Sequence, residues 1–272
     1  MPFKPVTPAR IVEELSDHLE FLNDVCDERR DITRLGNVCE EMCTHYRALG
    51  ICLLSESADM DGFFHYLIQS ALTRRHYLQG VSSAGGGDPR HSRASFIDPA
   101  FDAIAARQWR LAGDIFGSVA HEWTVGEEYE DDFCYAEFIR RLVTVRSDGA
   151  DELLARWREA LEGGVDLRLD VATALRAADA NLFDDTLLRL LQSQEAKARA
   201  IADPVDGSLA AEDATFYPNR WVSIEGLALL AVARREGLTV TDELPACPPL
   251  ARSSEFTAFR PRGYPNLPFE NE

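Results

Sequence analysis

Carboxylate side chains are concentrated in one short stretch of the chain. Between Leu111 and Ile139 there is no lysine or arginine, but there are eight acidic residues: Asp114, Glu122, Glu127, Glu128, Glu130, Asp131, Asp132 and Glu137. Five of the eight fall between Glu127 and Asp132, at the start of a helix predicted over 129–145. Carboxylates at this density can bind a divalent cation, recognise a basic partner, or complement the positive end of the helix dipole.

A magnesium site is the first interpretation. Glu127, Glu128 and Asp131 match the acidic spacing that holds magnesium in helical terpene synthases, and oxygen ligands suit that ion. Those enzymes need a second motif on a facing helix, and the segment 181–185 (NLFDD) lacks its Ser/Thr and Glu at the required steps. We therefore predict no metal ligands and no catalytic residues here, and we keep a metal-dependent all-α enzyme as an alternative.

A recognition surface is the second interpretation. A concentrated negative patch attracts a basic partner and fixes its orientation. Trp123 and Tyr129 flank the acids and are the residue types that anchor protein interfaces. We therefore predict a partner-binding site made of eight residues: Glu122, Trp123, Glu127, Glu128, Tyr129, Glu130, Asp131 and Asp132.

A structural role is the third interpretation. Two or three acids at a helix N-terminus complement its dipole, but five within six residues also repel one another. The acids would alternatively pair with arginines of the same fold, and the candidates are Arg74, Arg75, Arg140 and Arg141. Structural and recognition roles are compatible, so the exposure of residues 127–132 stays open at this point.

The overall charge excludes some partners. The chain has 46 Asp+Glu and 28 Lys+Arg, a net charge of −18, which argues against direct binding to nucleic acid or to an anionic membrane. The longest apolar run, Leu227 to Ala233, is far shorter than the roughly 20 residues that span a bilayer. No apolar targeting segment is visible near the N-terminus, so we expect a cytoplasmic protein.

Other enzyme motifs are missing from the sequence. Gly85-Gly86-Gly87 lacks the lysine of a phosphate loop, and no GxSxG string occurs. His121-Glu122 begins like a zinc-protease helix, but Val125 occupies the position of the second histidine. The six cysteines include no CxxC pair, and we interpret them as buried apolar residues. We therefore predict that the protein is not an enzyme and has no cofactor.

Helical periodicity accounts for most of the chain. After a Thr7-Pro8 start that extends to Cys26, apolar residues recur at helical spacing over 34–48, 58–79, 99–119, 129–145, 149–163, 166–179, 181–201 and 221–236. A Gly- and Ser-rich stretch over about 80–97 is predicted to be a flexible loop, and 203–220 a linker. No alternating pattern is long enough for a strand. We predict an all-α bundle of eight to ten helices.

The composition changes after residue 240. Six of the 13 prolines lie there, interleaved with Phe256, Phe259, Tyr264, Leu267 and Phe269. Proline excludes helix while aromatic side chains favour burial, so we predict an extended strap laid across the helices. We expect one all-α domain, with N-terminal helices over 1–55, a main helical body over 56–237 and an extended tail over 238–272.

Five strings occur in order along the chain: Phe63-Phe64 through Leu72-Thr-Arg-Arg-His-Tyr-Leu78, Phe101-Asp-Ala-Ile-Ala105, Trp123-Thr-Val-Gly-Glu-Glu-Tyr-Glu-Asp-Asp-Phe-Cys-Tyr-Ala136, Val222-Ser-Ile-Glu-Gly-Leu-Ala-Leu-Leu230 and Ala246-Cys-Pro-Pro-Leu-Ala-Arg252. This ordered set is similar to the immunity protein 49 family of bacterial polymorphic toxin systems. The resemblance covers about residues 60–250. It implies an all-α protein that is encoded beside a toxin used in competition between bacteria, and that binds and neutralises this toxin.

The resemblance and the acidic patch together predict an immunity protein. It would occlude the active site or substrate groove of a toxin that acts in the cytosol, with the acidic patch facing a basic toxin surface. A nuclease fits this description because nucleases carry basic grooves. The alternatives are the metal-dependent enzyme and a helical scaffold without a toxin partner. The sequence indicates neither the toxin's identity nor the oligomeric state.

Overall fold

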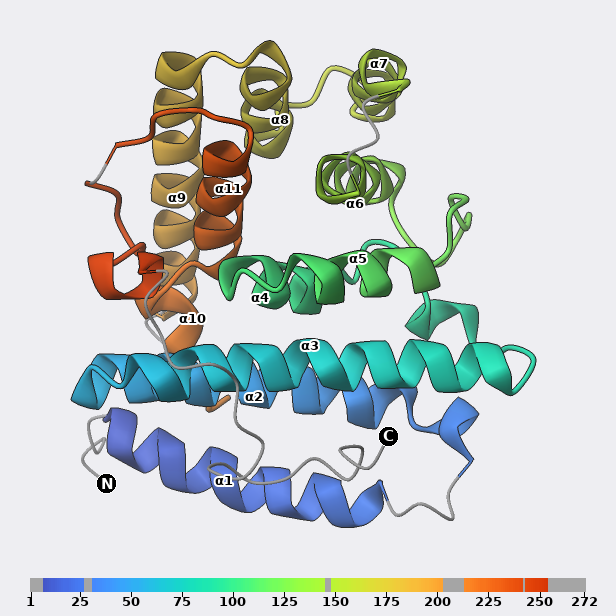
Figure 1. Ribbon diagram of the computed structural model, residues 1–272, viewed down its shortest axis with the longest axis vertical. Helices are drawn as coiled ribbons and strands as arrows, with labels where there is room; N and C mark the ends of the chain where they lie inside the picture. Colours follow the sequence, from blue (N-terminus) through green and yellow to red (C-terminus); the bar gives the residue numbers. More distant parts are fainter. Residues whose placement is uncertain (1–6, 27–30, 145–147, 203–212, 242, 254–272) are drawn as a thin grey trace.

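The computed structural model describes residues 7–26, 31–144, 148–202, 213–241 and 243–253. Within these ranges the chain forms eleven α-helices and no strand, which confirms the all-α fold class (Figure 1). The predicted number was eight to ten. The structure has more because the helix predicted over 99–119 is two helices, and because a four-residue helix precedes the last long one.

Three long helices form one side of the molecule, at the bottom of Figure 1. They are α1 (Pro8–Val25), α2 (Gly36–Ser57) and α3 (Met60–Ser83). The first begins as predicted: Thr7 caps it by accepting a hydrogen bond from the backbone N–H of Arg10, and Pro8 occupies the first turn. Helix α1 packs on α2, and α2 packs along α3.

Helices α2 and α3 extend beyond their predicted ends at residues 48 and 79. Helix α3 lies between α2 on one side and α4 and α5 on the other, so it buries side chains around most of its circumference. A helix enclosed in this way loses the one-sided apolar pattern that marks its ends. The loop predicted over 80–97 therefore starts four residues late, after Ser83, and it contains the short helix η2 (Pro89–His91).

A middle layer replaces the single helix predicted over 99–119. It consists of α4 (Asp98–Ala105) and α5 (Trp109–Ser118). The break falls at Arg107, whose φ of 61° is left-handed. Because apolar residues continue on both sides of the break, the periodicity gives no sign of it.

The remaining helices were predicted to within three residues at each end, apart from the short α10. They are α6 (Glu130–Val143), α7 (Ala150–Ala160), α8 (Leu167–Ala177), α9 (Ala180–Ala202), α10 (Pro218–Trp221) and α11 (Ile224–Arg235). Neighbours α6 to α9 pack pairwise along the chain, and α11 packs on α4. The buried apolar residues form one cluster that extends from Ile11 to Ala251.

The described parts of the tail, residues 238–241 and 243–253, include buried residues and a backbone contact to the helices. Ser223 donates its backbone N–H to the carbonyl of Ala246 at 2.7 Å, and the short helix η4 (Pro249–Arg252) follows. Cys247 and Ala251 are buried. The aromatic residues on which the predicted strap depends, Phe256, Phe259, Tyr264 and Phe269 with Leu267, lie outside the described residues.

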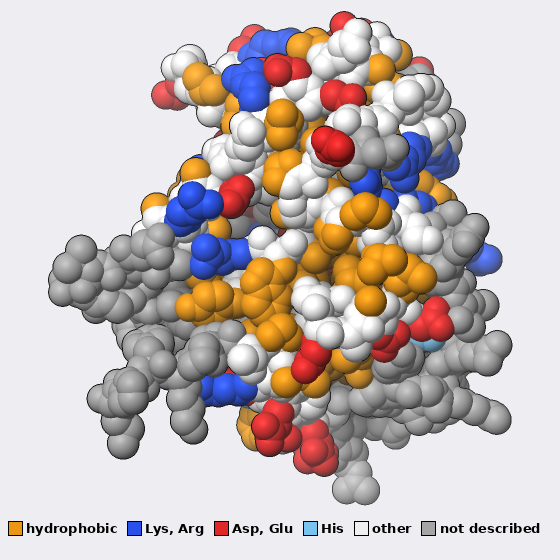
Figure 2. Space-filling view, turned by 90° about the vertical axis from the view of Figure 1, so that its left-hand side faces the viewer, with side chains coloured by type: hydrophobic (Ala, Val, Ile, Leu, Met, Phe, Trp, Pro, Cys, Tyr) orange, Lys and Arg blue, Asp and Glu red, His pale blue; other side chains and the backbone are white. Residues whose placement is uncertain are grey.

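The face on the left of Figure 1 carries apolar side chains at its centre, and acidic side chains lie around it as separate residues (Figure 2).

Among the described residues, no helix combines the length and the apolar character needed to cross a membrane.

Candidate functional site

The predicted recognition residues lie on the loop between α5 and α6 and on the first turn of α6. This loop stands at the right-hand edge of Figure 1. It turns back at Gly126, whose φ of +91° favours glycine, and an isolated bridge joins Val125 to Glu128. Val125 and Tyr129 are 75% and 79% exposed, so the loop presents an aliphatic and an aromatic side chain to solvent.

Glu128 holds this loop in shape. Its carbonyl accepts a hydrogen bond from the Trp123 indole at 3.0 Å, and its Oε2 accepts one from the backbone N–H of Ser95 at 2.9 Å. The Trp123 side chain is half-buried and packs on the apolar core. Trp123 and Glu128 were predicted to contact a partner. In the structure the Trp123 indole and the carbonyl and Oε2 of Glu128 are hydrogen-bonded within the chain, while Oε1 of Glu128 is buried without a hydrogen-bond partner among the described residues.

Two acids of the first turn of α6 pair with arginines of later helices. Glu130 binds Arg156 at 2.6 Å, and Asp132 lies 3.5 Å from Arg168. The Arg156 guanidinium also lies over the rings of Trp123 and Phe133, at 5.8 and 5.3 Å from their centroids. Local reading of the sequence missed both arginines, because they lie 26 and 36 residues beyond the acids that they contact.

The arginines proposed from the sequence as partners of residues 127–132 bind elsewhere. Arg140 and Arg141 bind Glu137 at 2.5 and 3.0 Å, and Arg75 lies 3.7 Å from Asp114. The buried Arg74 donates to the carbonyl of His91 at 2.6 Å. Arg140 and Arg141 follow Glu137 by three and four residues, so they pair with this glutamate on their own helix.

Arg168 forms its shorter ion pair with Glu225 of α11. It contacts this carboxylate at 2.8 Å, while the Tyr135 hydroxyl and the Gln194 amide donate to the same carboxylate at 2.7 and 2.5 Å. Burial raises the pKa of Asp132, the nearby Asp131 raises it further, and Arg168 only partly offsets both effects. The Arg168 network therefore belongs to the contact between α6, α8 and α11 more than to the loop.

Among the described residues, three acids of the cluster have neither an ion pair nor a side-chain hydrogen bond: Glu122, Glu127 and Asp131. Glu122 and Glu127 are exposed and Asp131 is half-buried. Together with Tyr129, they are the predicted site residues that the structure leaves available to a partner. Val125 joins them as a residue that the sequence prediction missed, because a lone valine in a loop gives no signal of exposure.

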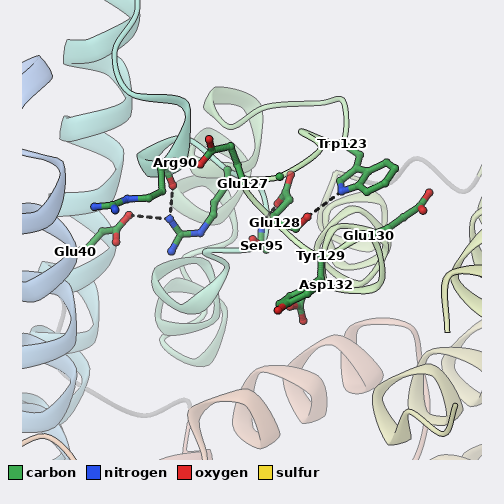
Figure 3. Close-up of a pocket in the computed structure, with 11 residues that line it drawn as sticks. Glu40, Arg90, Ser95, Trp123, Glu127, Glu128, Tyr129, Glu130 and Asp132 are labelled. Carbon is green, nitrogen blue, oxygen red and sulfur yellow. Dashed lines mark hydrogen bonds and ion pairs between the residues drawn. The ribbon is translucent and has the colours of Figure 1, made fainter.

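A pocket of about 820 Å³ opens beside the loop (Figure 3). It is lined by Glu127, Tyr129 and other loop residues, and also by Arg90 and Arg93. Arg90 donates to the side-chain oxygen of Asn37 at 2.8 Å, while Arg93 lies 3.6 Å from Glu40 and donates to the Arg90 carbonyl. The pocket is therefore bordered by both signs of charge.

The described lining of this pocket contains five carboxylates, two arginines and the exposed Tyr129. Among these described residues there is no histidine, cysteine or lysine, and the one serine, Ser95, supplies a backbone N–H to Glu128. The magnesium interpretation also lacks geometric support. Within the described ranges, Glu127, Glu128 and Asp131 do not bring their carboxylates together as a group that could hold an ion.

Three of the five strings that resemble the immunity family lie in the largely buried helices α3, α4 and α11, and a fourth covers η4, where Ala251 is buried and Leu250 is exposed. Only the third string, 123–136, contains the exposed loop, so most of the resemblance concerns residues that build the fold. No family model matches the chain, and neither curated proteins nor solved structures give a match.

Proposed function

We propose that this chain is an immunity protein that binds a bacterial toxin domain in the cytoplasm and covers its active site or substrate groove. The observation that carries the proposal is the surface of the α5–α6 loop. Val125 and Tyr129 project into solvent there, between the acids Glu122, Glu127 and Asp131, which have no ion pair among the described residues.

This combination suits a protein partner with a basic surface. An exposed tyrosine buries a large, rigid area at low entropic cost, and aromatic anchors of this kind dominate binding energies. Carboxylates without an internal partner attract positive charge and speed association. A toxin whose groove binds phosphates carries the matching basic surface, so a nuclease domain is the partner class that the loop fits best.

The test uses the toxin domain encoded by the neighbouring gene. Co-expression should restore growth, and the purified proteins should form a stable complex. Tyr129→Ala should weaken this complex by about 30-fold or more, as expected for a residue at the centre of an interface. Glu127→Gln with Asp131→Asn should slow association and reduce its dependence on salt concentration.

Matched controls lie on α1. Phe21→Ala removes another exposed aromatic side chain, and Glu13→Gln with Glu20→Gln removes two exposed charges far along the chain from the loop. These controls should bind as the unmodified chain does, and all variants should unfold at similar denaturant concentrations. If the neighbouring gene encodes no toxin, or if the toxin does not bind, the proposal is wrong. If loop and control variants bind equally well, the loop is not the binding surface.

A further inference from the structure

Two helices each present a glutamate and a histidine four residues apart. Glu14 and His18 lie one turn apart on α1, and Glu41 and His45 lie one turn apart on α2. Residues at this spacing share a helix face. Because α1 packs on α2, the two pairs meet at the same place on the surface, where they line one pocket of about 410 Å³.

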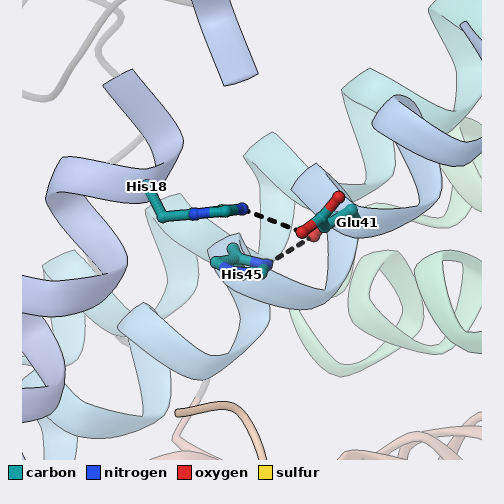
Figure 4. A group of neighbouring side chains, drawn as sticks. All are labelled: His18, Glu41 and His45. Atoms are coloured by element: carbon teal, nitrogen blue, oxygen red, sulfur yellow. Dashed lines mark hydrogen bonds and ion pairs between the residues drawn. The ribbon is translucent and has the colours of Figure 1, made fainter. Parts of the chain in front are cut away.

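Three of these side chains converge at the contact between the helices (Figure 4). The Nε2 of His18 lies 2.8 Å from Oε1 of Glu41, and the Nδ1 of His45 lies 2.8 Å from the Glu41 carbonyl. The two imidazole rings stack, with centroids 4.7 Å apart and planes inclined by 19°. One ligand atom from each residue lies within 4.8 Å of those from the other two.

We propose that His18, Glu41 and His45 bind a divalent transition-metal ion of the zinc class, which fastens α1 to α2. Two imidazoles and one carboxylate form a ligand set that zinc uses with a fourth, open position. The adjoining pocket provides space for that position, and Glu14 and Asp213 line it with two further carboxylates.

The geometry needs only a small adjustment to hold an ion. Ligand atoms around tetrahedral zinc are separated by about 3.4 Å, given zinc–nitrogen distances of about 2.0–2.1 Å. The His18 and Glu41 side chains are 42% and 46% exposed, so both can rotate towards a common centre without disturbing the core. The Glu41 carbonyl fixes the orientation of the His45 ring, as second partners of metal-bound histidines commonly do.

An ion also explains why two histidines lie against each other at this surface. The two rings stack at 4.7 Å, where two protonated imidazoles would repel each other, whereas metal binding uses the neutral imidazole. The inference is independent of the proposed function, since none of these residues lies on the α5–α6 loop.

The test is zinc binding by the full chain, purified without a histidine tag and treated with a chelator. Calorimetry should show one ion per chain, and zinc should raise the thermal unfolding midpoint, since an ion that binds only the folded chain stabilises it. Cobalt should give visible absorption without a thiolate charge-transfer band, because the described cysteines are all buried and are not ligands in this proposal.

Each ligand substitution should weaken binding at least tenfold: His18→Ala, Glu41→Gln and His45→Ala. His121→Ala is the matched control, because it removes an exposed histidine on the α5–α6 loop, and it should bind zinc as the unmodified chain does. Without metal, the His18→Ala and Glu41→Gln variants should unfold like the parent chain. The proposal fails if zinc binding is not saturable, if the ligand variants retain full affinity, or if cobalt reports thiolate ligands.

Discussion

Arg47 of α2 donates two parallel hydrogen bonds to the carboxylate of Asp102 of α4, from Nε to Oδ1 at 2.7 Å and from Nη2 to Oδ2 at 2.8 Å. The Ser70 hydroxyl of α3 donates to the same carboxylate at 2.5 Å. Asp102 is fully buried and Arg47 nearly so. Together with Ser70, the pair therefore connects three helices, α2, α3 and α4, inside the core.

Removing one member of this pair should destabilise the fold strongly. Asp102→Ala leaves the Arg47 guanidinium buried without its partner, so we expect the free energy of unfolding to fall by about 3–5 kcal/mol. Asp98→Asn is the control, because Asp98 is 58% exposed and contacts the same arginine at 3.4 Å. It should change stability by less than about 0.5 kcal/mol. Urea unfolding measures the free energy of unfolding of both variants. Similar losses of stability in the two would show that the burial of Asp102 does not determine how much its ion pair contributes.

Glu137 should make stability depend on pH. Burial raises its pKa, but hydrogen bonds from Arg140 and Arg141 outweigh this effect and leave the pKa below its usual value. The folded chain therefore prefers ionised Glu137, and the resulting stabilisation is fully present above the unfolded pKa of about 4.3. It is lost as the pH falls further, through the lowered folded pKa. The difference in unfolding free energy between the unmodified chain and Glu137→Gln should be constant from neutral pH to about 5 and shrink below that.

Gly36 should tolerate no larger side chain. A Cβ atom at this position would meet the ring of His91 at 2.3 Å, and the His91 ring is itself fixed by Glu40 at 3.0 Å. Gly36→Ala should therefore cost about 1–3 kcal/mol through overpacking. Gly117→Ala on α5 is the matched control, since nothing lies within 4 Å of its Cβ position. It should be neutral or stabilise by up to about 1 kcal/mol in thermal unfolding.

The conformation of the α5–α6 loop should depend on Glu128. Glu128→Ala removes the acceptor for the Ser95 N–H, so amide hydrogen exchange over 121–129 should become faster. Glu127→Ala is the control, because the backbone N–H of Glu127 donates to the Thr124 carbonyl while its exposed side chain makes no hydrogen bond or ion pair among the described residues. Exchange in that variant should match the unmodified chain. Equal exchange in all three proteins would show that the Glu128 side chain does not hold the loop.

Local sequence signals predicted helices well where each helix has one buried face and a capped end. Thr7 and Pro8 fixed the start of α1, and its apolar spacing fixed the buried face. The same reasoning missed the end of α3, which is enclosed by other helices, and the break at Arg107, where no glycine marks the left-handed residue. The spacing of apolar residues along the sequence indicates where helices form, but it does not indicate which other helices surround them.

The candidate site was predictable in part for the same reason. The density of acidic residues from Glu127 to Asp132 pointed to the loop. Which of these acids form ion pairs depends on Arg156 and Arg168, and these arginines come near only because α7 and α8 pack beside α6. The group of His18, Glu41 and His45 was not found, because it depends on how α1 is aligned against α2. In both groups of residues, contacts between helices determine which side chains come together.

The hydrogen bonds that Glu128 receives from Trp123 and Ser95 have a consequence for the cost of association. A flexible loop loses backbone conformational entropy when a partner fixes it, at roughly 1–2 kcal/mol for each residue. The two hydrogen bonds already restrain the backbone of this loop in the folded chain, so in the proposed complex less of that entropy is left to be lost on binding.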